Sequence, residues 1–98
     1  MASVRNLKKD IDYLVSLVVV DCFQYVTYFK EVNKEAAYKI VDDILSTRDE
    51  LRARVNHPDG KDNPKLIKNY YQDIAKDLMQ SCDNAYEELG KLVEKSAS

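Results

Sequence analysis

The sequence has few of the residues that interrupt or cross-link a chain. Its 98 residues include two glycines, two prolines and two cysteines, and no tryptophan. So few turn-forming residues disfavour an all-β fold, which needs a turn about every ten residues, and exclude collagen-like and linker-like chains. The cysteines, Cys22 and Cys82, are too few for a disulfide scaffold. We therefore expect reduced thiols and a cytoplasmic location.

Long apolar runs and an export signal are also missing. The longest strictly aliphatic run is Leu17-Val18-Val19-Val20, which ends at Asp21, whereas a membrane-spanning helix needs about 20 apolar residues. The N-terminal segment has neither the apolar region nor the cleavage site of a signal peptide. The pattern therefore predicts no membrane partner. The net charge of -2 predicts no long-range attraction for nucleic acid.

The motifs of common catalytic and cofactor sites are absent as well. The single histidine, His57, lies in the turn-rich segment 56–64, and no glycine-rich phosphate loop is present. Two cysteines without a nearby histidine pair do not make a zinc site, and the acidic residues after His57 do not match a calcium loop. We therefore predict no catalytic residues, no metal and no cofactor, and the sequence favours a protein that is not an enzyme.

What the sequence does contain is helical periodicity. After the cap signal Asn63-Pro64, apolar residues recur three or four positions apart and predict a helix over 64–95, at Ile67, Tyr71, Ile74, Leu78, Cys82, Ala85, Leu89 and Leu92. A similar stripe predicts a helix over 4–32, at Val4, Leu7, Ile11, Leu14, Val18, Cys22, Tyr25, Phe29 and Val32. Another predicts a helix over 34–55, at Ala37, Ile40, Val41, Ile44, Leu51 and Val55. The valines and aromatic residues of 18–29 also favour a strand, but they show no alternation. Asn33 is a predicted N-cap, and without a break at 31–33 the first two segments would form one helix.

Three long helices with short connections are typical of an up-down-up three-helix bundle. The predicted fold class is therefore all-α, with residues 1–98 as a single domain. In this arrangement the first and third helices are parallel, so Cys22 and Cys82 lie at the same height. Free cysteines are usually small buried hydrophobes, and we expect both in the core.

The first helix is apolar around almost its whole circumference. Between Leu14 and Phe29, the strongly polar residues are Ser16, Asp21, Gln24 and Thr27. A helix that is apolar all round is normally buried, and two neighbouring helices cannot easily cover it. We therefore predict that the chain self-associates, with a symmetric dimer favoured, or docks a partner protein. The predicted interface residues are Val19, Val20, Phe23 and Val26. The alternative is a wide core face with some exposed valines.

Two charged residues face the apolar direction, Asp21 on the first helix and Arg48 on the second. A fold-back at Asn33 sets residue 21 opposite about residue 45, one turn from Arg48. This register predicts a buried or half-buried Asp21–Arg48 ion pair, unless both side chains reach solvent. A functional version of the same arrangement is an internal pocket, in which Asp21, Arg48, Tyr25 and Tyr28 hold an anionic or polar ligand.

The opening segment 4–13 carries a Leu-Lys-Lys-Asp-Ile motif, at residues 7–11, that is followed by a polar residue and Tyr13. This motif, with the apolar stretch and two further helical segments, resembles the start of a family of short, uncharacterised bacterial proteins. The resemblance implies a small all-helical protein and brings no activity. Three functions remain open: an interaction module, a small-ligand-binding bundle, and a weak nucleic-acid contact through Arg5, Lys8 and Lys9.

Overall fold

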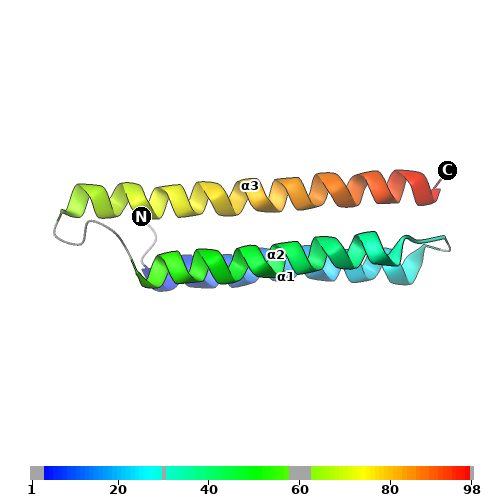
Figure 1. The fold of residues 1–98 in the computed structure, drawn as a ribbon, viewed down its shortest axis with the longest axis horizontal. Helices are drawn as coiled ribbons and strands as arrows, with labels where there is room; N and C mark the ends of the chain where they lie inside the picture. The colour runs from blue at the N-terminus through cyan, green and yellow to red at the C-terminus, as the bar shows by residue number, and fades with distance from the viewer. Residues whose placement is uncertain (1–3, 30, 58–62, 98) are drawn as a thin grey trace.

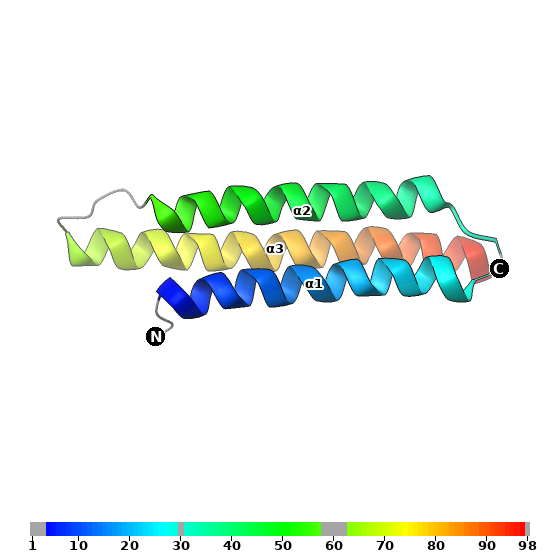
Figure 2. The ribbon, with the colours of Figure 1, turned by 90° about the horizontal axis from the view of Figure 1, so that it is seen from below.

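A computed structural model describes residues 4–29, 31–57 and 63–97, and this part of the chain contains three helices and no strand. Helix α1 spans Val4–Tyr28, α2 spans Lys34–Asn56 and α3 spans Pro64–Ala97. Figure 2 shows that α2 runs antiparallel to α1 and α3, which are parallel to each other. The molecule is a rod with dimensions of 54 × 19 × 16 Å. The predicted all-α, up-down-up three-helix bundle is confirmed.

The core is one continuous cluster along the axis of the rod, and every helix contributes to it. The buried side chains recur three or four positions apart because that spacing keeps them on one side of a helix. On α1 they are Leu7, Ile11, Val15, Val18, Cys22 and Tyr25. On α2 they are Ala37, Ile40, Val41, Ile44, Leu51 and Val55, and on α3 they are Ile74, Leu78, Cys82, Ala85 and Leu89. No charged or polar side chain is buried among the residues that the structure describes.

The break between α1 and α2 lies where the sequence predicts it, although α1 ends at Tyr28 and not at residue 32. In a continuing helix the N–H of Asn33 would bond to the carbonyl of Phe29. Here that N–H donates to the hydroxyl of Tyr25 at 3.0 Å. The side chain of Asn33 caps α2 by accepting the N–H of Ala36 at 3.0 Å. A buried tyrosine of α1 therefore satisfies the N–H that Asn33 would have used in a continuing helix.

The same tyrosine joins the ends of all three helices. The hydroxyl of Tyr25, besides accepting the bond from Asn33, lies 2.7 Å from the hydroxyl oxygen of Ser96 in the last turn of α3. The ring of Tyr25 packs against that of Phe29, with 5.4 Å between the ring centroids. This end of the bundle is therefore held by one side chain, which contacts each of the three helical segments or its cap.

At the opposite end, α3 is longer than its neighbours. Its first turns extend past the ends of α1 and α2 (Figures 1 and 2). Asn63 caps α3 as predicted, because its side-chain oxygen accepts the N–H groups of Lys65 and Leu66. The hydroxyl of Tyr70 donates to the carbonyl of Arg54 at 2.7 Å and so ties the extension to the end of α2.

Helix α1 is also long and apolar enough to cross a membrane, judged by length and composition alone. An 18-residue window between Arg5 and Tyr28 has a mean hydropathy of 1.2, and 28% of it is buried inside the bundle. The short aliphatic run underestimates this apolarity, since Ile11, Leu14, Cys22, Phe23 and Val26 contribute to it outside the run. The predicted absence of a membrane partner therefore stays a prediction.

Candidate interaction surface

Helix α1 carries a second apolar stripe on the side that faces away from the core. The exposed fractions are 63% for Tyr13, 38% for Leu17, 49% for Val20, 48% for Phe23 and 77% for Tyr28. Tyr38 of α2 extends this surface, because its ring meets Phe23 edge to face at 6.3 Å between centroids. We call these six residues the outer face. An amphipathic helix of a small bundle usually presents polar residues in this direction.

Three polar side chains, Ser16, Gln24 and Thr27, lie between the residues of the outer face, and they add little polarity to this surface. The hydroxyl of Ser16 donates to the carbonyl of Tyr13 at 2.6 Å, and that of Thr27 donates to the carbonyl of Phe23 at 2.8 Å. These bonds to the backbone of the same helix satisfy both hydroxyl protons. Gln24 is the remaining polar side chain, and it is exposed. The surface is therefore more apolar than its composition indicates.

The carboxylates of the middle of α1 are turned aside from the outer face. Asp12 accepts a bond from Arg52 of α2 at 2.5 Å. Asp21 lies on the side of α1 that faces α3, close to the phenol of Tyr86. Burial, together with the neighbouring Asp21 carboxylate, raises the pKa of Tyr86 to about 12. Between Asp12 and Phe29 the sequence has no other charged residue than Asp21, so a long part of the outer face is free of charge.

The predicted Asp21–Arg48 pair does not form, and this prediction is wrong. Arg48 is half-buried and binds the neighbouring Asp49, with its Nε at 3.2 Å and a terminal nitrogen at 3.1 Å from the same carboxylate oxygen. The helix register explains the difference. Contacts of Phe23 with Tyr38 and of Asp12 with Arg52 place Asp21 opposite the region of Ile40 and Val41. Arg48 therefore lies about two turns away along α2.

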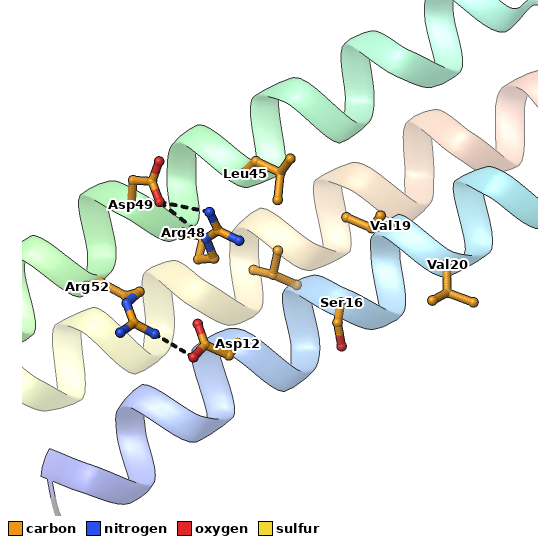
Figure 3. A pocket seen from close by; sticks show the side chains of 9 residues that line it. Asp12, Ser16, Val19, Val20, Leu45, Arg48, Asp49 and Arg52 are labelled. Carbon is orange, nitrogen blue, oxygen red and sulfur yellow. Dashed lines mark hydrogen bonds and ion pairs between the residues drawn. The ribbon is translucent and has the colours of Figure 1, made fainter.

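A groove of about 510 Å³ runs beside the outer face, between α1 and α2. Its residues are Asp12, Val15, Ser16, Val19, Val20, Leu45, Arg48, Asp49 and Arg52. Figure 3 shows that the groove has two unlike ends. The Arg52–Asp12 and Arg48–Asp49 pairs lie at one end, whereas Leu45, Val19 and Val20 form an apolar end. Both arginines are already paired with carboxylates. A molecule bound in the groove would therefore make mainly apolar contacts and would find no unpaired arginine.

The predicted interface residues lie partly on this surface. Val20 and Phe23 belong to the outer face, and Val19 lines the groove. Val26 is half-buried and packs against the core.

The predicted ligand set is not brought together. Arg48 lies in the groove, Asp21 faces α3, Tyr25 is buried at the end of the bundle and Tyr28 is exposed. The internal pocket of these four residues is therefore a wrong prediction. It fails for the same reason as the ion pair, because the register separates the arginine from the other residues.

Sequence reasoning missed two aromatic residues of the outer face, Tyr13 and Tyr38. Tyr13 precedes Leu17 and Val20 by four and seven positions, which is itself a helical spacing. That second apolar stripe could have been recognised in the sequence. Tyr38 gives no such signal, because its place beside Phe23 depends on the register between α1 and α2.

The thiols and the other titratable groups do not form a reactive centre on this surface. Cys22 and Cys82 are free and buried, as predicted, and burial raises the pKa of each thiol. Both lie close enough to Tyr86 to affect its pKa, in agreement with their predicted common height. Among the described residues, no three histidine, cysteine, aspartate or glutamate side chains gather as a metal site requires.

No family model, curated protein or solved structure matches the chain. The resemblance of residues 4–13 to short bacterial proteins therefore stays a prediction. Function has to be argued from the geometry of this surface alone.

Proposed function

We propose that the protein is a non-enzymatic interaction module, which associates with another protein surface through the outer face. The observation that carries the proposal is the second apolar stripe of α1, exposed on the side opposite the core. Apart from the contact of Phe23 with Tyr38, this stripe lies outside the core that holds the three helices together. Its burial against another surface would remove apolar area from water, which is the main driving force of protein association.

The size of the outer face supports the proposal. An aromatic side chain has an area of roughly 150–250 Å² and leucine and valine have less, so the exposed fractions correspond to at most about 600 Å² for the six residues. The largest apolar patch of an ordinary monomer is about 300–600 Å² and is often functional. The outer face is therefore at the upper end of that range, although the chain is short.

The position of the polar groups supports association over small-ligand binding. The groove is open along its length and its two arginines are bound to carboxylates. A small-ligand site usually encloses most of its ligand and offers unpaired polar groups. The residues of the ligand hypothesis are also dispersed, so we propose no ligand.

A photo-crosslinking amino acid at position 20 tests the proposal in the cells from which the protein comes. The outer face predicts one discrete covalent protein adduct, because Val20 lies at its centre. Position 66 is the matched control, since Leu66 is 53% exposed and Val20 is 49% exposed, yet Leu66 lies in the first turn of α3. The absence of an adduct at position 20, or the same adducts at both positions, would contradict the proposal.

A further inference from the structure

We infer that the occupant of the outer face is a second copy of this chain, whose α1 packs antiparallel to the first around a twofold axis near Val20. The inference rests on the proposed function and names its partner. A twofold interface buries the same surface on both subunits, and residues on either side of the axis meet each other. Tyr13 then lies beside Tyr28 of the second copy, and Leu17 beside Phe23.

The charges at the two ends of α1 select this orientation. Arg5 and Lys9 are exposed near the start of α1, with Asp10 beside them, whereas Glu31 and Glu35 are exposed just beyond its end, with Lys34 between them. An antiparallel pair around an axis near Val20 places Lys9 of one copy opposite Glu31 of the other. A parallel pair would place like charges together, which is unfavourable. Neither Lys9 nor Glu31 has an ion pair within the described part of its own chain.

Between these ends the outer face can lose its water at low cost. The carboxylate of Asp12 is paired with Arg52 of α2, Asp21 is turned toward Tyr86 of α3, and the hydroxyl protons of Ser16 and Thr27 are bonded to the backbone. Burial of polar groups is costly mainly where they lose a partner. In this register Gln24 lies opposite Ser16 of the second copy, whose hydroxyl oxygen can accept a bond from its amide.

The area is sufficient for a dimer of moderate affinity. Two outer faces of roughly 600 Å² each would bury roughly 1,200 Å², which is the lower limit of the usual range for stable interfaces. Interfaces near this limit are commonly weaker than larger ones. We therefore expect a dissociation constant on the order of 1 μM or weaker, and a monomer–dimer equilibrium that dilution shifts.

Sedimentation equilibrium of the purified full chain tests the second copy as occupant. We expect the mass to approach twice 11.3 kDa as the concentration rises. Val20→Lys should raise the dissociation constant at least about tenfold, because two lysines would meet at the axis. Leu66→Lys, which removes an equally exposed apolar side chain elsewhere, should leave it unchanged. Lysine is a better helix former than valine, and circular dichroism would verify that both variants are folded.

Charge reversal tests the antiparallel orientation. Lys9→Glu and Glu31→Lys should each raise the dissociation constant about threefold or more at low salt. The double variant should restore it toward the wild-type value, because it recreates the pairs with the charges exchanged. A parallel dimer would show no such rescue, and the absence of rescue would overturn the orientation.

The remaining outcomes also decide the inference. A wild-type chain that stays monomeric at about 1 mM, or a dimer that Val20→Lys does not weaken, would overturn it. So would a monomer that floats with phosphatidylcholine vesicles, since lipid would then cover the face. A monomer that still forms a discrete adduct with a different protein in the cell would refute the second copy and leave the proposed function intact.

Discussion

Removal of one hydroxyl group should loosen the end of the bundle where α1, α2 and α3 meet. Tyr25→Phe deletes the oxygen that accepts the N–H of Asn33 at 3.0 Å and contacts the Ser96 hydroxyl at 2.7 Å. Each such bond contributes about 0.5–1.5 kcal/mol. Asn33 is exposed and Ser96 half-buried, so water can replace part of what is lost. We expect the free energy of unfolding to fall by about 1–2 kcal/mol.

Urea denaturation followed by circular dichroism would measure this loss, with all variants at one protein concentration because self-association adds to apparent stability. Tyr28→Phe is the matched control, since the Tyr28 side chain is exposed and has no hydrogen bond in the described part of the chain. Ser96→Ala should cost about half as much, and the double variant little more than Tyr25→Phe alone. A change below about 0.5 kcal/mol in Tyr25→Phe would refute the idea that this hydroxyl joins the helices.

Three further predictions follow from single groups. Tyr86 should ionise near its pKa of about 12. Its raised pKa stabilises the folded chain below about pH 10, where the unfolded phenol ionises, and this stability should be lost as the pH rises toward the folded value. Carbon-labelled tyrosine NMR would detect both the shift and its decrease in Asp21→Asn, and a Tyr86 that titrates with the exposed tyrosines would contradict the prediction. Cys22 and Cys82 should react slowly with an aromatic disulfide reagent at neutral pH and rapidly in urea, because burial raises the pKa of both thiols; fast reaction of the folded chain would argue against a closed core. Asn33→Ala should lower the free energy of unfolding by about 1 kcal/mol through loss of the α2 cap, and an unchanged urea midpoint would disprove that role.

Local periodicity was sufficient to predict the fold and much of the core. For α2, the predicted inward residues are the same six that the structure buries. On α3 the stripe is correct, but Ile67 and Tyr71 are only half-buried, because this part of the helix lies close to the extension past its neighbours. On α1 the prediction included Leu14 and missed Val15, which is buried. An error of one position is expected where a helix is apolar on nearly every side.

Contacts between helices could not be predicted from the sequence. Asp21 and Arg48 were paired on an assumed register, whereas the actual register depends on where α1 ends. The connection after that end is bonded to Tyr25, whose other partner, Ser96, lies 71 positions along the chain. No local pattern encodes such a contact. The interface prediction succeeded in part for the opposite reason, since excess apolarity is a property of α1 alone.

The odd number of helices has a consequence for anything joined to this protein. Because α1 and α3 are parallel, the chain enters the rod at one end and leaves it at the other, along a body 54 Å long. Two reporter proteins fused to the N- and C-termini would therefore be held apart at opposite ends of the rod. A four-helix up-down bundle would instead place both termini, and both reporters, at the same end.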